Sequence, residues 1–474
     1  MSMSKSLPNI KNNFSDWYNE VIYASELADQ SPVRGCIVIR PYGYSLWENV
    51  KNILDEKIKK TGHLNALFPL FIPLSFLEKE AEHVAGFSPE LAVVTHAGGK
   101  KLEEPLVVRP TSETMIHYMF AQWIHSWRDL PLKINQWANV VRWELRTRPF
   151  LRTSEFFWQE GHTAHETAEE AHEEATLMLA EYIDLAEHYL AIPVISGKKT
   201  AQEKFSGAEV TFTFETLMQD GKALQMGTSH LISQSFAHAF NMKYQDRNGE
   251  LAYPYLTSWG VTTRLIGALV MVHGDQKGLV LPPKVAPIQV VIIPIYKKGS
   301  NKQELDAMIH EIYTRLKPIL RVHVDDDDNT PGTKFYEWEL KGVPLRVEIG
   351  PKDMRTHTAV VVDRLGIVKE SIPFIALETV LAEKLELLQK TLFDRAQNRL
   401  HTMRHVRTKL DEFAQELEEH GGFYQTGWCG NNACEKLLKK HKATIRCIIR
   451  EQQLSSCFNC DKASNADVLI AKSY

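Results

Sequence analysis

The sequence lacks the features that define several large classes of protein. Its longest apolar runs, such as Leu265–Val272, are far shorter than the roughly 20 residues of a membrane helix. The N-terminal residues contain no apolar stretch typical of a signal peptide. Only six of the 474 residues are cysteine, too few for a disulfide scaffold. We therefore predict a cytoplasmic protein with no membrane partner.

Two further absences limit how the chain could bind a polyanion. The net charge is only −4, with 24% charged residues, so any nucleic acid must meet a local basic surface, and we expect no DNA partner. No G-x-x-x-x-G-K-[ST] segment occurs, so a nucleotide would not be held by a P-loop.

The chain is long enough for about three domains, and its patterning suggests where they meet. The proline-rich segment Leu281–Pro287 is the clearest linker. Before it, the capping boxes Ser45-x-x-Glu48 and Thr167-x-x-Glu170 each open an amphipathic helical pattern. After it, strand and helix patterns alternate as in a small α/β domain, and a charged helical stretch leads to a cysteine-rich tail. We predict domains at residues 1–283, 284–400 and 401–474.

The segment Val140–His162 combines strand patterning with four arginines: Arg142, Arg146, Arg148 and Arg152. Side chains of equal parity share one face of a strand, so Arg142 and Glu144 should lie opposite an apolar face, Val141, Trp143 and Leu145. On the return strand the residues sharing one face are Phe156, Trp158, Glu160 and His162. A salt-bridged sheet surface would explain an isolated Arg-x-Glu pair. A loop with further arginines favours a polyphosphate, because a guanidinium binds phosphate oxygens bidentately.

Other segments add similar chemistry. Arg109–Glu113 offers a hydroxyl and a carboxylate, and Gln225–His230 offers an amide, two hydroxyls and an imidazole. Arg264 stands at the start of a strongly apolar helical pattern, where a lone buried cation is costly without an anion. Together these segments supply two separated arginines for one anion.

These residues resemble the motifs of class II aminoacyl-tRNA synthetases. Motif 1 resembles Gly62–Phe71, with His63 where an apolar residue is commoner; motif 2 resembles Arg142-x-Glu144 through Phe156, and motif 3 resembles Gly260–Gly267. The ordered segments FPLFIP, RPTSE, RTRPFLRTSEF, WQEGH, GTSH and SWGVTTR resemble the prolyl-tRNA synthetases, in particular the short archaeal and eukaryotic-like type. The implied fold class is a multidomain α+β and α/β protein. It has a class II antiparallel-sheet catalytic core with flanking helices, an α/β anticodon-binding domain and a small C-terminal zinc domain.

The resemblance implies a role for each site residue. Arg142 and Arg264 would be catalytic, by neutralising charge that develops on the phosphates. The residues implied to bind proline are Thr111, Glu113, Arg142, Trp158, Glu160, His162 and His230. The residues implied to bind ATP are Arg142, Glu144, Arg152, Thr153, Gln225, Thr228, Thr262 and Arg264, with Gln225 near Mg²⁺.

The implied reaction joins L-proline to AMP from ATP, with Mg²⁺, and transfers prolyl to the 3′ end of tRNA(Pro); the implied assembly is a homodimer. Only about a hundred residues separate Arg142 from Arg264, too few to add an editing domain to the core, so we expect no editing in cis. Residues Glu339, Arg346, Lys352 and Asp353 match positions that read the anticodon, although isolated charges more often face solvent.

Two pairs of cysteines occur in the tail, Cys429-x4-Cys434 and Cys457-x2-Cys460. This spacing suits a tetrahedral structural Zn²⁺, with free thiols or disulfides as the alternatives. Cys36 is interpreted as a core residue.

Two other functions fit part of the sequence. A non-catalytic synthetase-like regulator would bind RNA or an amino acid, but such relatives usually lose an ATP contact, and both motif arginines are present. A class II enzyme for threonine or histidine would share motifs 2 and 3, and a threonine site would need metal ligands in the catalytic domain.

Overall fold

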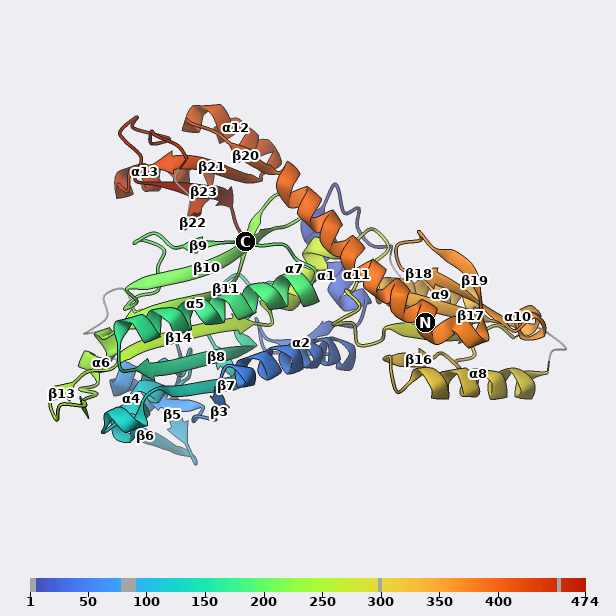
Figure 1. The fold of residues 1–474 in the computed structure, drawn as a ribbon, viewed down its shortest axis with the longest axis horizontal. Helices are drawn as coiled ribbons and strands as arrows, with labels where there is room; N and C mark the ends of the chain where they lie inside the picture. Colours follow the sequence, from blue (N-terminus) through green and yellow to red (C-terminus); the bar gives the residue numbers. More distant parts are fainter. Residues whose placement is uncertain (1–5, 78–90, 297–300, 450–452) are drawn as a thin grey trace.

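The computed structural model describes residues 6–77, 91–296, 301–449 and 453–474. Its main feature is an 11-stranded sheet with the strand order β20-β21-β23-β22-β9-β10-β11-β14-β8-β7-β3 (Figure 1). The strands of the N-terminal half are β3 (Leu64–Asn65), β7 (Leu132–Val141), β8 (Glu155–His165), β9 (Ile195–Lys198), β10 (Val210–Leu217), β11 (Ala223–Ser233) and β14 (Tyr255–Thr262). Neighbouring strands from β9 to β7 are antiparallel, as the predicted class II core requires.

Helices cover one face of this sheet and enclose the largest core. They are α1 (Phe14–Ala24), α2 (Pro41–Lys60), α5 (Ala168–Asp184), its π-helical continuation η2 (Leu185–Tyr189) and α7 (Arg264–His273). The capping prediction holds for α5, where the Thr167 side chain accepts a hydrogen bond from the backbone of Glu170. It is wrong for α2, which begins at Pro41, before the predicted cap at Ser45. Proline suits the first helical position because its missing N–H has no partner there.

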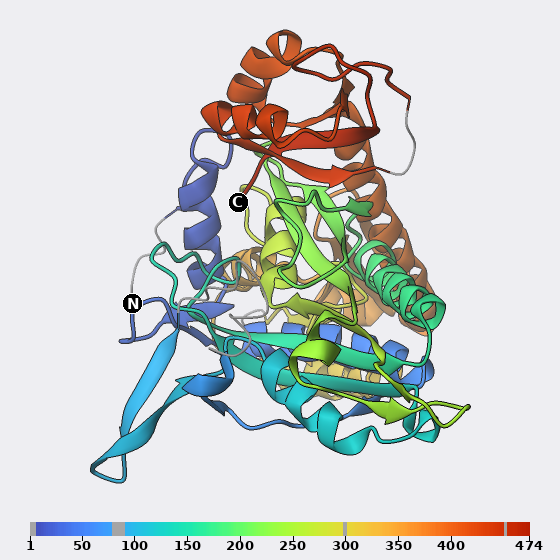
Figure 2. The same ribbon diagram turned by 90° about the vertical axis from the view of Figure 1, so that its left-hand side faces the viewer.

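Smaller elements surround the other end of the sheet. An arm of β4 (Phe71–Pro73), β5 (Ala92–Ala97) and β6 (Lys100–Val108) projects from the body of the molecule (Figure 2). The remaining elements here are the pair β1 (Ala28–Gln30) and β2 (Ile37–Ile39), the helices α4 (Glu113–Trp123), η1 (Trp127–Asp129) and α6 (Ser235–Ala239), and the pair β12 (Tyr244–Gln245) and β13 (Leu251–Ala252).

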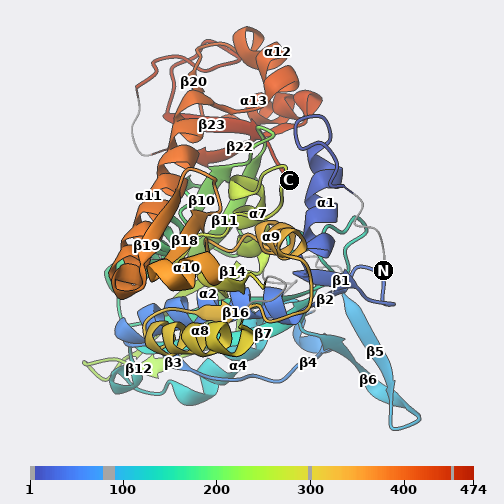
Figure 3. The same cartoon turned by 90° about the vertical axis from the view of Figure 1, so that its right-hand side faces the viewer.

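The segment after the proline-rich linker forms a separate five-stranded sheet with the order β16-β15-β17-β18-β19 (Figure 3). Its elements are β15 (Val290–Pro294), α8 (Lys302–Leu316), β16 (Val322–Val324), α9 (Pro331–Leu340), β17 (Leu345–Ile349), α10 (Pro351–Thr356), β18 (Thr358–Asp363), β19 (Lys369–Pro373) and η3 (Phe374–Ala376). Parallel pairing of β15 with β16 and β17 confirms the predicted α/β alternation.

The long helix α11 (Leu377–Thr402) runs from this sheet to the C-terminal elements (Figure 1). These are β20 (Arg404–Val406), α12 (Leu410–His420), β21 (Phe423–Trp428), α13 (Asn432–Leu437), η4 (Leu438–His441), β22 (Ala443–Ile448) and β23 (Ala466–Lys472). They do not form an isolated sheet, because Ile448 of β22 pairs with Lys198 of β9 and so joins them to the 11-stranded main sheet. Within the described residues, we find no helix with the length and apolar character needed to cross a membrane.

A buried ion cluster fixes this junction. The Glu215 carboxylate on β10 accepts hydrogen bonds from the Lys199 ammonium at 2.7 Å and from the Arg446 guanidinium of β22 at 2.9 Å. All three side chains are almost completely buried. These attractions outweigh the effect of burial and lower the pKa of Glu215 from its usual value of 4.5. The C-terminal strands are therefore bound to the catalytic sheet by charge as well as by backbone pairing.

Candidate active site

A cleft of about 480 Å³ opens on the face of the main sheet, and all of the residues predicted to bind proline or ATP line it. Strands β8, β11 and β14 form its floor, the β7–β8 loop and the start of α4 form one wall, and α7 begins at its edge. The cleft thus brings together segments that are far apart in the sequence.

Strand register places a glycine in the floor of the cleft. Gly260 of β14 pairs with Glu160 of β8 on one side and with Thr228 of β11 on the other. A Cβ atom on Gly260 would lie 3.0 Å from the carbonyl oxygen of Gln159 and 3.8 Å from the Trp158 ring, so this position of the floor has little room for a side chain. The predicted common face of Trp158, Glu160 and His162 is confirmed, because all three line the cleft.

Arg142 projects from the end of β7 into the cleft. Its Nε donates to the carbonyl of Pro110 at 3.0 Å, and the guanidinium lies 5.3 Å from the centre of the Trp158 ring. The side chain faces the open cleft, but surrounding protein atoms displace water and lower its pKa, opposed by the carboxylates of Glu160, Glu144 and Glu113. Arg142 is therefore held by the protein with its charge directed at the cavity.

Arg264 approaches from the other side as the first residue of α7. Its side chain donates to the carbonyls of Leu151 at 3.2 Å and Gln225 at 3.3 Å. Burial, followed by repulsion from Arg152 and Arg142, lowers its pKa to about 10. Two guanidinium groups thus repel each other across one cleft, which an anion between them would relieve.

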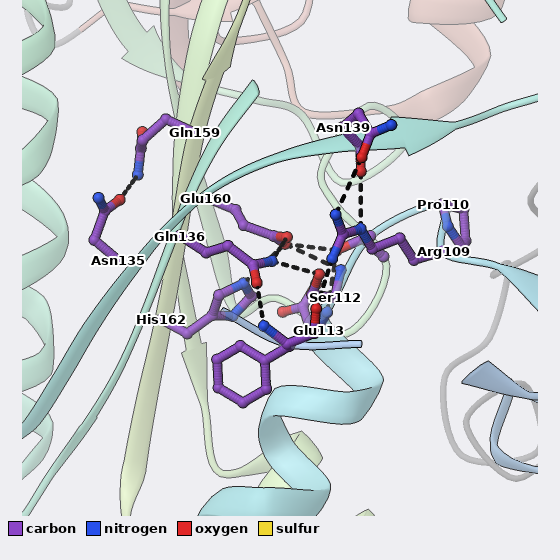
Figure 4. A network of polar contacts seen from close by, with 12 residues as sticks. Arg109, Pro110, Ser112, Glu113, Asn135, Gln136, Asn139, Gln159, Glu160 and His162 are labelled. Carbon is purple, nitrogen blue, oxygen red and sulfur yellow. Dashed lines mark hydrogen bonds and ion pairs between the residues drawn. The ribbon is translucent and has the colours of Figure 1, made fainter. Parts of the chain in front are cut away.

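A polar network surrounds Glu160 at the end of the cleft that also contains Glu113 (Figure 4). Glu160 accepts hydrogen bonds from the Gln136 amide at 2.8 Å, the Ser112 backbone at 3.1 Å and the Thr111 hydroxyl at 3.3 Å. Burial raises the pKa of Glu160, but the hydrogen bond and charge of His162 and the Ser112 donors outweigh burial and lower it overall. Glu113, the first residue of α4, is buried beside this network. This end of the cleft is suited to a cation.

His230 forms a neutral part of the wall. Its Nδ1 lies 2.9 Å from the Thr211 hydroxyl and its Nε2 lies 3.0 Å from the Thr228 hydroxyl. Burial, with a smaller contribution from His162, lowers the pKa of His230 to about 3. The ring therefore contributes shape and hydrogen bonding at neutral pH rather than charge.

Remaining predicted residues lie in the β7–β8 loop and at the end of β14. Glu144 lies 3.7 Å from Arg152, and the Thr153 hydroxyl donates to the carbonyl of Glu155. The Thr262 hydroxyl accepts from the backbone of Arg264. The predicted strand alternation is wrong beyond β7, which ends at Val141. Trp143 and Leu145 are exposed, so no other layer of the protein packs against the side of the hairpin that was predicted to be apolar.

Several lining residues carry no motif that sequence analysis could use. Phe156 lies against Arg142, Phe205 packs against the His230 ring, and Lys199 reaches the cleft from its ion pair with Glu215. Phe156 belongs to the face of β8 that the strand period predicts, together with Trp158, Glu160 and His162. The other two depend on contacts between distant segments.

The four predicted zinc ligands converge in the C-terminal region. The sulfur of Cys429 lies 3.8 Å from that of Cys434 and 3.7 Å from that of Cys460, and the four sulfurs lie within 4.8 Å of one another. A disulfide would require about 2.05 Å. Sulfurs about 2.3 Å from a tetrahedral zinc are separated by about 3.8 Å, so the donor set fits the ion. Cys447 packs in a separate core, and Cys36 is only partly buried, not a core residue as predicted.

The residues predicted to read an anticodon lie on α9, β17 and α10. Arg346 pairs with Glu348 at 2.9 Å and lies over the Phe335 ring, and Lys352 is exposed. Glu339 pairs with Lys277 at 2.8 Å, and Asp353 accepts a hydrogen bond from the Gly350 backbone. Glu339 and Asp353 thus already have structural partners.

Three family profiles match successive parts of the chain. They are the tRNA synthetase class II core domain (G, H, P, S and T) over residues 95–273, the anticodon binding domain over residues 289–384, and the prolyl-tRNA synthetase C-terminal domain over residues 410–474. The matched regions follow the order in which the catalytic sheet, the five-stranded sheet and the C-terminal elements occur.

Similar proteins cover nearly the whole chain. Proline–tRNA ligase 2 of Clostridioides difficile is 50% identical over 99% of this chain and 98% of its own length, and proline–tRNA ligase of Borreliella burgdorferi is 49% identical over 100% of both. A crystal structure of prolyl-tRNA synthetase from Cryptosporidium parvum complexed with halofuginone and AMPPNP has a TM-score of 0.94 at 41% identity, covering 99% of both chains. The same enzyme complexed with L-proline and AMP has a TM-score of 0.92 at 40% identity, covering 98% of this chain and 99% of that one.

Proposed function

Because this chain belongs to the prolyl-tRNA synthetases, the proline–tRNA ligases of class II, we propose that its cleft activates L-proline with ATP and transfers prolyl to the 3′ end of tRNA(Pro). It is an ATP-dependent aminoacyl-tRNA ligase. The observation that carries the residue-level proposal is the pair of repelling guanidinium groups, Arg142 and Arg264, on opposite sides of one cleft.

In the proposed mechanism the arginine pair holds the triphosphate of ATP. Arg142 binds the proline carboxylate and the α-phosphate, and Arg264 binds from the γ-phosphate side. The carboxylate attacks the α-phosphorus in line, and pyrophosphate leaves. Both guanidinium groups stabilise negative charge that develops on the phosphoryl oxygens, so no general base is required. The remaining proposed ATP-binding residues are Glu144, Arg152, Thr153, Gln225, Thr228 and Thr262.

The carboxylate-lined end of the cleft is proposed to bind the proline ring and its imino cation. Glu113 supplies the opposing charge and Thr111 a hydroxyl, and burial of Glu113 strengthens this attraction. Trp158, Glu160, His162 and His230 form the walls. His230 stays neutral and so does not repel the imino cation.

Mg²⁺ is proposed to accompany ATP, with the Gln225 amide oxygen near it. Mg²⁺ prefers oxygen ligands and neutralises phosphate charge when bound. The alternative of a non-catalytic regulator has no observation in its favour, because both arginines line the cleft.

We propose a structural zinc ion at Cys429, Cys434, Cys457 and Cys460, supported by the sulfur separations. Four thiolates would leave no open coordination position, so the ion would stabilise the C-terminal fold without catalysing the reaction. Zinc analysis of the purified protein tests this proposal. A folded C-terminal region without zinc would contradict it.

The tRNA partner is proposed to contact the five-stranded sheet. Arg346 and Lys352 supply donors suited to guanine, and Glu339 and Asp353 are proposed to help read the anticodon. The domain division 1–283, 284–400 and 401–474 is proposed to separate catalysis, anticodon binding and zinc binding. Each matched profile falls within one of these ranges. Alanine discrimination is proposed to depend on the pocket alone, without editing in cis.

A homodimer in the cytoplasm is the proposed working form. Leu64 and Leu67, from the motif 1 segment, are 74% and 80% exposed, which supports burial against a second copy. His63 of the same segment does not belong to that surface. It is buried against Trp259 and lies 3.0 Å from Glu174. Sedimentation at micromolar protein concentration measures the assembly, and a Leu67→Glu variant should be monomeric.

Amino-acid-dependent ATP–pyrophosphate exchange tests the proposed chemistry. Wild-type protein should exchange with proline far faster than with threonine, alanine or cysteine, and Arg142→Ala should lose most of that rate. Arg247→Ala is the matched control, because Arg247 forms an exposed ion pair with Glu166 away from the cleft. Near wild-type exchange by Arg142→Ala would refute the assignment of Arg142.

A further inference from the structure

A cluster of three side chains that could bind a metal ion lies beside the cleft, and one of its members, His117, has no role in proline or ATP binding. Glu113 and His117 lie one turn apart on α4, and His162 of β8 faces them. One ligand atom from each lies within 4.8 Å of the others, and all three side chains are buried. Ligand atoms about 2.0–2.2 Å from one zinc ion are at most about 4.4 Å apart, so these separations are close to those that a shared ion requires.

His117 is the unusual member. Its ring is completely buried, and among the described residues neither of its nitrogens has a hydrogen-bond partner. Phe236 and His162 pack against the ring, with centroid distances of 5.0 and 5.7 Å. A buried polar group without a partner destabilises the folded protein.

His162 is oriented for the same purpose. Its Nε2 lies 3.3 Å from Glu160, and a carboxylate can only accept, so this nitrogen carries the proton. In the neutral ring with this tautomer the Nδ1 presents a lone pair, and it has no hydrogen-bond partner in the described structure. A carboxylate that fixes the tautomer of a ligating histidine is the usual second partner of protein zinc sites. Figure 4 shows His162 and Glu113 beside Glu160.

We propose that Glu113, His117 and His162 bind a divalent transition-metal ion, such as Zn²⁺, that competes with proline. One carboxylate and two imidazoles form a ligand set typical of zinc. Glu113 and His162 line the cleft, so the ion enters through the cleft and its open coordination position faces it. This inference rests on the proposed function in one respect, the assignment of Glu113 to the proline imino group. Metal and imino acid then exclude each other.

Calorimetric titration of Zn²⁺ into the full chain tests the proposal, after the cysteine site has been loaded and loose metal removed. Wild-type protein should bind one further equivalent of zinc, and proline at about ten times its Kd should weaken that binding about tenfold. Added zinc should likewise raise the KM for proline in pyrophosphate exchange while leaving kcat unchanged.

A His117→Phe variant should lose the additional equivalent, because an aromatic ring fits among the phenylalanines but cannot ligate. His238→Phe is the matched control, since His238 is exposed on α6 and should leave zinc binding unchanged. Should His117→Phe fail to fold, wild-type protein titrated with Co²⁺ decides the question. The additional equivalent should then show visible absorption without intense thiolate charge-transfer bands.

Three results would overturn the inference: no additional equivalent in wild-type protein, equal binding by folded His117→Phe, or cobalt bound only with thiolate bands. Proline-dependent exchange without added zinc is measured on the same preparation and tests the proposed function alone. Normal exchange with no additional zinc equivalent would reject the metal site and leave the proposed function intact.

Discussion

Two groups of charge lie near each other, one buried beneath the cleft and one lining it, and their internal balance differs. In the Lys199–Glu215–Arg446 cluster, both cations donate to one carboxylate and the pKa of Glu215 is lowered. At the cleft, Arg142 and Arg264 bond mainly to backbone carbonyls, and burial lowers the pKa of each. The first group is complete within the protein, whereas the second requires an anion.

This difference separates charge used for folding from charge used for binding. Breaking a complete cluster leaves uncompensated ions in the interior, so the cost falls on stability. Removing one of two repelling cations relieves strain in the free protein, so the cost falls on the bound state and the transition state.

The largest expected effect comes from breaking the complete cluster. Glu215→Ala should lower the free energy of unfolding by roughly 3–5 kcal/mol, because two buried cations lose their partner. Chemical denaturation monitored by circular dichroism measures this loss. Glu209→Ala, at an exposed position just before the same strand, is the control and should change stability little. Equal stability of the two variants would show that the cluster is not structural.

A slightly smaller effect, on catalysis, is expected at the cleft. Arg264→Gln should lower kcat/KM for pyrophosphate exchange by roughly 10²–10³-fold, as for other lost charge-stabilising groups. Its melting temperature should not fall, because the substitution removes the repulsion from Arg142 and Arg152. A variant that lost both stability and activity in proportion would contradict the division between the two groups.

The stabilisation that a bound ATP analogue gives to the folded protein provides a further test of the arginine pair. AMPPNP at about 100 times its Kd should stabilise the wild-type protein by about 2.7 kcal/mol. The same concentration should stabilise Arg264→Gln much less, because the triphosphate loses one cation. Differential scanning fluorimetry over a range of AMPPNP concentrations gives both values. Equal stabilisation of the two proteins would place the triphosphate away from Arg264.

The smallest effect concerns how the free energy of unfolding falls at acidic pH. The folded-state pKa of Glu215 is lower than its ordinary value of 4.5, so the unfolded state binds more protons below that pH. The stabilisation is complete above pH 4.5 and is lost as pH falls through the depressed folded pKa. Glu215→Gln should therefore show a shallower loss of stability below pH 4.5. If the free energy of unfolding fell with pH equally steeply in the variant and the wild type below pH 4.5, Glu215 would make no such contribution.

Local patterning was sufficient for much of the fold. Strand patterns that alternate with helical patterns predicted β15, β16 and β17, and the continuous burial of β15 is what a covered parallel sheet requires. The common face of Trp158, Glu160 and His162 followed from the two-residue period of β8. The cleft residues themselves came from the resemblance to a known family, since their convergence depends on segments as distant as Thr111 and Arg264.

The errors have physical reasons. The alternation at Arg142 and Glu144 resembled a strand, but no second layer covers Trp143 and Leu145, and the chain leaves the sheet after Val141. The buried position of His63 depends on Glu174, far along the chain. Asp325, in a run of four aspartates, is buried and accepts a hydrogen bond from the Trp338 indole. Such contacts leave no periodic signal in either segment.

The pairing of β22 with β9 has a consequence for biosynthesis. The edge of the main sheet at β9 is covered by β22, a strand that is translated long after β9. Arg446, the partner of Glu215, also arrives at that stage. Until this segment has left the ribosome, the nascent chain carries an open β edge at β9, and Glu215 is paired with Lys199 alone. A chain truncated before β22 should therefore fold less stably in its catalytic half as well.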